Sequence, residues 1–325
     1  MKKPFKVILF FFTFVLLCLG GLLTYVKTAL PNVGAAPELK VALTPLRIER
    51  GKYLAHHVAA CMDCHSTRDW GKYTGPLIPG TLGKGGEIFD QTMGFPGRFV
   101  SKNITPNGIG DWSDGEIYRA ITSGVDKSGK SLFPVMPYGS YGKMDKEDVY
   151  AIIAYLRTLE PIKNDVEEAQ PDFPMNFIIN TIPQKANPTA LPDKKDTLAY
   201  GKYLFTVASC GECHTKQDKG APIKGMEFAG GFEFPIPNGT IVRSSNITPD
   251  IESGIGRWSK QAFVNRFRAF ADTNFVAHNI GQGDYNSIMP WTMYGKMTEE
   301  DLSAIYTYMR TLPPIKNKVI KFTKL

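Results

Sequence analysis

The chain has 325 residues, of which 43% are hydrophobic and 21% are charged, and its formal net charge is +7. This composition excludes a disordered or collagen-like chain, and the length favours two domains over one. Residues 1–27 contain four lysines and no acid, so more than half of the net charge belongs to the N-terminal end. These lysines are Lys2, Lys3, Lys6 and Lys27. The basic charge therefore indicates membrane topology and says little about binding of nucleic acid.

The first predicted element is a membrane-spanning helix at residues 7–26. These twenty residues are almost all apolar and uncharged, and a helix of this length can cross a bilayer. The lysines before it place the short N-terminal side in the cytoplasm, so the rest of the chain is expected on the periplasmic side. We interpret residues 1–30 as an uncleaved anchor in the cytoplasmic membrane, and Cys18 as apolar filler within it. The alternative is a signal peptide cleaved near residues 33–35, which would also export the remainder.

The rest of the chain contains an internal repeat, in which short segments recur in the same order. The matching segments are 51–54 with 201–204, 103–106 with 246–249, 108–113 with 254–259, 136–137 with 289–290, 141–144 with 294–297, and 157–164 with 310–317. We therefore predict two copies of one domain, at residues 45–164 and 197–325. Prolines keep the linker at residues 165–196 irregular and fairly extended, and apolar residues at 173–179 suggest that it packs on the domains.

Each copy is predicted to be mainly helical. A helix at about 45–60 leads into the first cysteine pair, and one starting near 197 leads into the second. A serine followed three residues later by glutamate is a capping box, which predicts a helix over 113–124. Apolar residues at helical spacing predict a closing helix at 145–156, and the same pattern begins again at 298. Since no segment shows convincing strand alternation, the predicted fold class is all-α.

Two identical motifs carry the predicted chemistry. The pattern Cys-x-x-Cys-His occurs at residues 61–65 and at 210–214. It is the attachment signature of c-type haem: two thiols one helical turn apart form thioethers with the haem vinyl groups, and the adjacent imidazole binds the iron. The predicted tethers are Cys61, Cys64, Cys210 and Cys213, and the predicted proximal ligands are His65 and His214. We thus predict two covalently bound haem c groups. Structural zinc would need a further nearby cysteine pair, and a dithiol redox site would need a βαβ setting.

The sixth iron ligand distinguishes an electron carrier from an enzyme that acts on a small molecule, because an open iron face binds small molecules. Met136 and Met289 are the favoured candidates, since they are aligned in the repeat and each precedes a proline. A following proline disfavours the α conformation, which suits a ligand on an extended loop. The aligned pair Met144 and Met297 competes for this role, but it stands at a helix start where packing explains it.

Several other side chains keep alternative interpretations open. His56, His57 and His278 have no counterpart in the other copy, so they are the weaker candidates for a second axial ligand. Four further residues recur in the repeat and would either donate hydrogen bonds to haem propionates or belong to the core and turns of each domain. They are Asn103, Trp112, Asn246 and Trp258.

These motifs resemble the bacterial multihaem cytochrome c subunits that accept electrons from periplasmic alcohol, aldehyde and gluconate dehydrogenases. The resemblance covers residues 47–164 and 197–317, and rests on the Gly-Lys-Tyr-Leu, Cys-x-x-Cys-His, Asn-Ile-Thr-Pro, Gly-Ile-Gly-x-Trp-Ser, Met-Pro and Arg-Thr-Leu segments. It implies a class I cytochrome c fold in each copy. It also implies the axial pairs His65 with Met136 and His214 with Met289. The chain departs from those subunits in carrying two haem motifs where they usually carry three.

The predicted function is electron transfer by an anchored dihaem cytochrome, and the chain itself is not expected to be an enzyme. The expected partners are a periplasmic dehydrogenase and a terminal oxidase or small cytochrome, with no nucleic acid. The alternative is a dihaem cytochrome c peroxidase, whose halves should diverge around the iron ligand, whereas both copies here keep Met-Pro. A haem-bearing sensory module would be expected to add a signalling domain, and we predict none.

Overall fold

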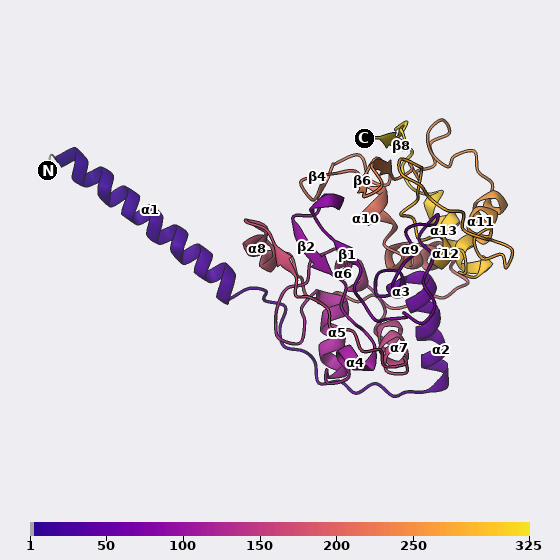
Figure 1. The fold of residues 1–325 in the computed structure, drawn as a ribbon, viewed down its shortest axis with the longest axis horizontal. Helices are drawn as coiled ribbons and strands as arrows, with labels where there is room; N and C mark the ends of the chain where they lie inside the picture. The colour runs from indigo at the N-terminus through magenta and orange to yellow at the C-terminus, as the bar shows by residue number, and fades with distance from the viewer. Residues whose placement is uncertain (1–2) are drawn as a thin grey trace.

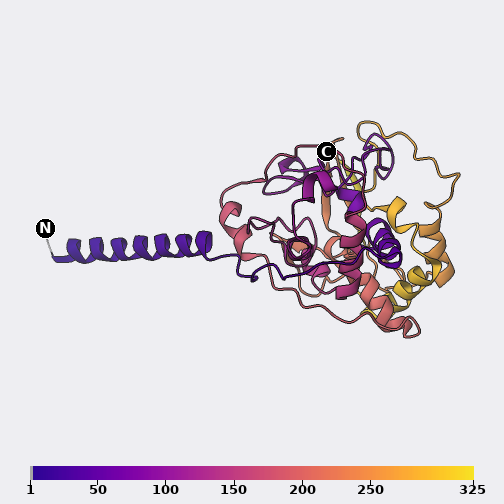
Figure 2. The ribbon, with the colours of Figure 1, turned by 90° about the horizontal axis from the view of Figure 1, so that it is seen from below.

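The computed structural model describes residues 3–325 as one long helix that projects from a globular body (Figures 1 and 2). The helix α1 spans Lys3–Thr28. Its stretch Pro4–Thr28 is strongly apolar and is not buried against the body, so by length and composition it can cross a membrane, as a signal sequence also can. The predicted helix at 7–26 is confirmed, whereas its role as an anchor stays a prediction. Of the lysines assigned to the cytoplasmic side, Lys2 lies outside the described residues.

The first half of the body starts with a helix that leads into the first cysteine pair. Its elements are α2 (Pro45–Tyr53), the π-helix η1 (Leu54–Val58), α3 (Cys61–Cys64), β1 (Ile88–Phe89), η2 (Gln91–Met93), β2 (Gly97–Val100), α4 (Pro106–Ile109), α5 (Asp114–Ser123), α6 (Tyr138–Tyr141) and α7 (Lys146–Leu156). Thr44 caps α2 by accepting a hydrogen bond from the Arg47 amide, and Pro45 occupies the first turn. The capping box is confirmed at Ser113, and α5 ends at the left-handed Gly124.

The linker and the second half follow. The linker contains β3 (Gln170–Pro171), α8 (Met175–Ile178) and η3 (Ile179–Thr181). The second half contains α9 (Thr197–Val207), α10 (Cys210–His214), β4 (Gln217–Asp218), β5 (Ala221–Pro222), β6 (Glu233–Ile236), β7 (Thr240–Arg243), α11 (Lys260–Arg268), α12 (Trp291–Tyr294), α13 (Glu299–Met309) and β8 (Phe322–Lys324).

The expectation of an all-α fold needs correction, because both halves contain short antiparallel strands. β1, β2 and β3 form one sheet in that order, β6, β7 and β8 form another, and β4 pairs with β5. The longest pairing, between β6 and β7, places Phe234 opposite Val242. Each strand is two to four residues long. Alternation of apolar and polar side chains over so few residues is too short to be recognised in a sequence.

The first and last helices of each half cross with close backbone contact. A Cβ atom added to Gly51 of α2 would lie 1.8 Å from the Ala151 carbonyl oxygen of α7. In the second half, a Cβ atom on Gly201 of α9 would lie 2.0 Å from the Ala304 carbonyl oxygen of α13. Only glycine permits such an approach, which explains the glycine of the repeated Gly-Lys-Tyr-Leu segment. The two halves therefore use the same helix crossing.

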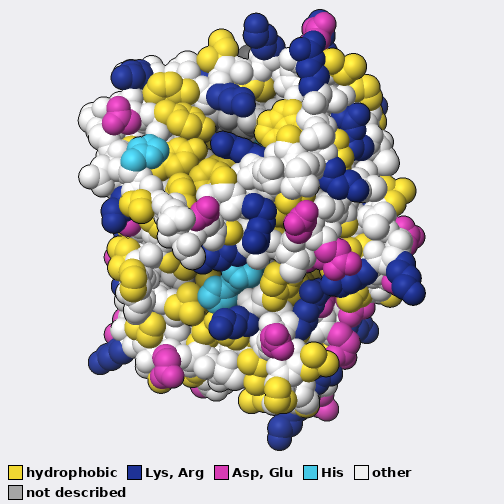
Figure 3. All heavy atoms as spheres, turned by 90° about the vertical axis from the view of Figure 1, so that its right-hand side faces the viewer, with side chains coloured by type: hydrophobic (Ala, Val, Ile, Leu, Met, Phe, Trp, Pro, Cys, Tyr) yellow, Lys and Arg dark blue, Asp and Glu magenta, His cyan; other side chains and the backbone are white. Residues whose placement is uncertain are grey.

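The two halves pack on each other through a reciprocal pair of hydrogen bonds. The Tyr53 hydroxyl of α2 donates to the Asp301 carboxylate of α13 at 2.5 Å, and the Tyr203 hydroxyl of α9 donates to Asp148 of α7 at 2.7 Å. Both carboxylates are buried, and one continuous apolar core includes side chains from both halves. On the face remote from α1, lysine and arginine side chains are interspersed with acidic ones (Figure 3). The two halves thus form one body with a mixed-charge surface on that side.

Candidate functional site

Each Cys-x-x-Cys-His motif starts from a left-handed residue and forms a short helix. Ala60 precedes α3 with a φ of 50°, and Ser209 precedes α10 with a φ of 54°. For a residue other than glycine this conformation is uncommon, and it costs about 1–3 kcal/mol. Its presence at the same position in both halves indicates that the same sharp turn delivers the cysteines of each motif.

Both motif histidines are oriented by a backbone carbonyl. The His65 Nδ1 atom lies 2.7 Å from the Lys102 carbonyl oxygen, and the His214 Nδ1 atom lies 2.7 Å from the Ser245 carbonyl oxygen. An imidazole that donates from Nδ1 keeps the lone pair of Nε2 for a metal. Burial lowers the pKa of both histidines, which favours this neutral form. His65 and His214 are therefore prepared to bind a metal through Nε2.

Two glycines that the sequence analysis missed hold these histidines in place. The Gly85 amide donates to the His65 carbonyl oxygen at 2.9 Å, and the Gly230 amide donates to that of His214 at 2.8 Å. Both glycines have a φ of +72°, and a Cβ atom would lie 2.5 Å from the Ser101 carbonyl oxygen at one and 2.4 Å from the Ser245 carbonyl carbon at the other. A Gly-Gly pair follows each motif in the sequence, and this recurrence was the signal that could have identified them.

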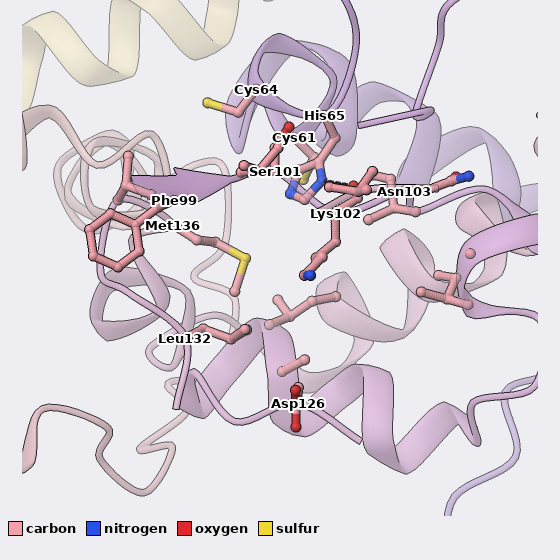
Figure 4. Close-up of a pocket in the computed structure, with 18 of the residues that line it drawn as sticks. Cys61, Cys64, His65, Phe99, Ser101, Lys102, Asn103, Asp126, Leu132 and Met136 are labelled. Atoms are coloured by element: carbon pink, nitrogen blue, oxygen red, sulfur yellow. Dashed lines mark hydrogen bonds between the residues drawn. The ribbon is translucent and has the colours of Figure 1, made fainter. Parts of the chain in front are cut away.

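A cavity of about 540 Å³ lies beside the first motif. Cys61, Cys64 and His65 line one part of it, and Met136 lines another. The Met136 thioether and the His65 imidazole both point into this space from different sides (Figure 4). Much of the remaining lining is apolar, as at Phe99, Ile104, Ile109, Trp112, Ile117, Leu132, Ile152 and Leu156. An apolar cavity with two thiols, an imidazole and a thioether fits a large flat apolar cofactor that carries a metal.

The second half places its methionine in the same local structure. Pro290 precedes α12 with a φ of −76°, just as Pro137 precedes α6 with a φ of −78°. The Trp291 amide donates to the Met289 carbonyl oxygen at 2.8 Å, and the Tyr138 amide donates to that of Met136 at 2.7 Å. The two Met-Pro segments therefore adopt one backbone geometry.

The Met289 loop is also held by a loop of the first half. The buried Thr74 hydroxyl donates to the Met289 carbonyl oxygen at 2.7 Å. Arg68 donates to the Thr74 carbonyl oxygen and forms a buried ion pair with Asp63, each at 2.7 Å. Since Asp63 lies between the first two cysteines, these bonds join the first motif to the loop of the second methionine. Sequence reasoning did not identify Asp63, Arg68 or Thr74, and the charged residue inside the motif was the only signal.

Comparison with known proteins bears on what these motifs hold. Residues 198–313 match the cytochrome c family model. The chain carries a cytochrome c domain. Curated relatives include the cytochrome c subunit of the quinone alcohol dehydrogenase of Komagataeibacter europaeus (29% identity, 82% of this chain, 56% of the relative) and that of the gluconate 2-dehydrogenase of Pantoea cypripedii (28%, 82% and 59%). A diheme cytochrome c-type protein of Cereibacter sphaeroides is 29% identical over 87% of this chain and 92% of its own length. The chain spans little more than half of the dehydrogenase subunits.

The predicted resemblance to cytochrome c subunits of dehydrogenases is thus confirmed. The matched cytochrome c domain contains the second motif, with His214 and Met289. The assignment of a second such domain to residues 45–164, and the role of each ligand, stay predictions.

The structure distinguishes the two pairs of candidate methionine ligands by their surroundings. Met144 and Met297 are each 1% exposed and belong to the apolar core, which agrees with a packing role. Met136 lines the cavity beside His65, as its predicted role requires. Met289 lies in the equivalent loop before α12.

The remaining candidates have local structural partners. The His56 Nε2 atom lies 2.6 Å from the Tyr155 hydroxyl, and the His278 ring stacks on Tyr73 at 4.9 Å. His57 is partly buried next to His56. The side-chain amide of Asn103 donates to the Ile162 carbonyl oxygen, and that of Asn246 donates to the Ile315 carbonyl oxygen, each at 2.8 Å and each after a closing helix. Trp258 is 39% exposed. Both asparagines therefore hold turns, and Asn103 and Trp112 also line the cavity, so a contact of these two with a haem propionate stays a prediction.

Proposed function

We propose that this chain is a membrane-anchored dihaem c-type cytochrome that transfers electrons on the periplasmic face of the cytoplasmic membrane. The observation that carries the proposal is the repeated histidine arrangement, in which Nδ1 of His65 and of His214 is held by a carbonyl and Nε2 is left for iron. Residues 1–30 are the anchor, residues 45–164 and 197–325 are tandem class I cytochrome c domains, and residues 165–196 are the linker.

Each domain supplies two tethers and two axial ligands. Cys61 with Cys64, and Cys210 with Cys213, form the thioethers. His65 with Met136, and His214 with Met289, are the axial pairs. A bound haem iron supplies one-electron exchange between Fe(II) and Fe(III). The chain contributes a closed sixth position, and the thioether ligands raise the reduction potential. Apolar walls around the first cavity exclude water from the ligands.

The partners follow from the names of the relatives. Several relatives are cytochrome subunits of dehydrogenases, which supports a periplasmic dehydrogenase as the electron donor. A terminal oxidase or a small cytochrome would accept the electrons. The diheme relative matches along 92% of its length, which supports two haems and also fits a carrier that stands alone. In either setting the chain carries electrons and a partner performs the oxidation of substrate.

An optical titration of the full chain, expressed with haem-maturation machinery, tests this proposal. We expect two haems per chain and a far-red sulfur-to-iron band in the oxidised protein. Met136→Ala and Met289→Ala should each remove about half of this band, because each haem contributes equally to it. Met144→Leu is the matched control and should leave the band unchanged. Ready turnover of peroxide by the parent protein, or one haem per chain, would contradict the proposal and favour a peroxidase or a monohaem protein.

A further inference from the structure

An apolar segment of the linker lies beside the end of α1. Residues 173–183 contain no charged side chain, and six of these eleven residues are large and apolar. They are Phe173, Met175, Phe177, Ile178, Ile179 and Ile182. This stretch, called the linker segment below, includes α8 and η3. It lies next to the junction between α1 and the globular body (Figures 1 and 2).

Specific contacts hold the linker segment at the C-terminal end of α1. The Asn180 side chain donates to the Val26 carbonyl oxygen at 3.3 Å and accepts from the Ser131 hydroxyl at 3.0 Å. The Lys27 ammonium lies 5.1 Å from the centre of the Phe177 ring. Asn180 therefore connects the last turn of α1 with the first half of the body. These contacts therefore fix the position of the linker segment along the axis of α1, at its C-terminal end.

One side of the linker segment packs on the body and the other is open. Ile179 is 6% exposed, whereas Phe173 is 82% exposed and Ile178 is 43% exposed. The sequence analysis expected these residues to pack on the domains, and this holds for Ile179 but not for Phe173. Asp172, which precedes this segment in the sequence, accepts a hydrogen bond from the Gln91 side chain at 2.8 Å and so points toward the body. An exposed phenylalanine beside an apolar helix end is a surface suited to lipid.

We propose that the linker segment is a second membrane contact, which inserts Phe173 and Ile178 into the interfacial layer of the same bilayer that α1 crosses. The inference rests on the proposed function, because it requires α1 to remain attached and to span the membrane. A spanning helix that ends at Thr28 brings the linker segment to the level of the lipid headgroups. Aromatic side chains favour this layer, and Lys27 is placed to meet lipid phosphates. Two contacts, in place of one flexible tether, would hold the body in one orientation over the membrane.

Spin labelling of the full haem-loaded chain in phosphatidylcholine–phosphatidylglycerol liposomes tests the proposal. Cys18→Ser provides the background, since the other cysteines are consumed as thioethers, and Phe173→Cys carries the nitroxide. We expect the label at 173 to collide more with oxygen, which concentrates in lipid, than with a water-soluble nickel chelate. Val276→Cys, at a residue that is 83% exposed in the second half, is the matched control and should show the opposite order.

A third label separates failure of this inference from failure of the anchor. Leu16→Cys lies in the middle of α1 and should favour oxygen if α1 spans the bilayer. If the label at 16 collides more with oxygen and the label at 173 collides more with the nickel chelate, the second membrane contact is overturned and the anchor is not. Preference for the chelate at both positions overturns both. Shielding of 173 from both reagents also overturns the proposal, because a protein surface would then cover it. An unchanged haem spectrum of each variant establishes that it is folded.

Discussion

Gly85 and Gly230 determine how the motif histidines are held, because each lies against the segment that accepts the Nδ1 hydrogen bond. Gly85→Ala and Gly230→Ala would force a Cβ atom against backbone and strain a left-handed residue. We expect each change to lower the free energy of unfolding by about 2–4 kcal/mol, since backbone clash adds to the strain of a positive φ.

The control for these changes is Gly80→Ala, at a glycine with a φ of +78° and nothing within 4 Å of an added Cβ atom. Denaturant unfolding of the haem-loaded chain measures all three variants. Equal destabilisation at positions 80 and 85 would show that conformation alone matters and that the contact with the histidine segment does not.

His56 makes stability depend on pH. Burial and the neighbouring His57 lower the pKa of His56 from 6.5 to about 4. Because the unfolded chain binds this proton more tightly, the stability from neutral His56 is complete above pH 6.5 and is lost as the pH falls toward 4. His56→Gln keeps a hydrogen-bond partner for Tyr155 and should reduce the fall in unfolding midpoint between pH 7 and pH 5. His278→Gln, which also removes an imidazole, is the control, and an equal reduction there would exclude His56 as the cause.

At the scale of elements, the loop that carries Thr74 links the two halves. Thr74 has a φ of 61°, a strained conformation for a β-branched residue, and its amide donates to the Asn286 side chain at 2.9 Å. The strain persists because the Arg68, Asn286 and Met289 contacts hold this residue on several sides. The backbone of the second methionine loop thus depends on a residue of the first half.

Thr74→Val removes the hydroxyl that holds the Met289 carbonyl oxygen and leaves that oxygen without this donor. If Met289 ligates the second iron, we expect its sulfur-to-iron band to weaken and the potential of one haem to fall while the other is unchanged. Thr74→Ser restores the hydroxyl and should restore both signals. A redox titration followed optically measures the two haems. Equal shifts of both haems would indicate a general loosening of the fold.

Tyr53 and Tyr203 each join helices of opposite halves. Their carboxylate partners, Asp301 and Asp148, differ in the hydrogen bonds that remain when the tyrosine hydroxyl is removed. Asp148 also receives two hydrogen bonds from Arg50, each at 2.9 Å, whereas Asp301 keeps a single tyrosine donor, Tyr200, at 2.9 Å. Removing a donor from a buried carboxylate costs about 1–3 kcal/mol. We therefore expect Tyr53→Phe to destabilise the chain more than Tyr203→Phe in denaturant unfolding. The reverse order would mean that Asp301 finds another donor.

The sequence predicted those features that depend on local pattern. The apolar run of α1, the capping box of α5 and the helices that lead into each motif follow from residue spacing over one or two turns. Strands of two to four residues carry no usable pattern. The bonds from Tyr53 to Asp301 and from Thr74 to Met289 join residues more than two hundred positions apart, so they depend on how the halves pack. The helix start at Met144 already favours Met136 as the ligand in the sequence, and the cavity beside His65 and the burial of Met144 agree with that preference.

At the scale of the whole molecule, the two halves share one apolar core and the reciprocal hydrogen bonds, so we expect them to fold as one unit although the sequence predicts two domains. A protease site inserted between the exposed residues Gln184 and Lys185 would cut the linker between the halves. We expect the cleaved chain to remain associated on size exclusion and to unfold in one transition, because the apolar contact between the halves survives the cut. The uncut chain with the inserted site is the control. Two separated transitions, or dissociation of the fragments, would show that each half folds alone and that the linker supplies the association.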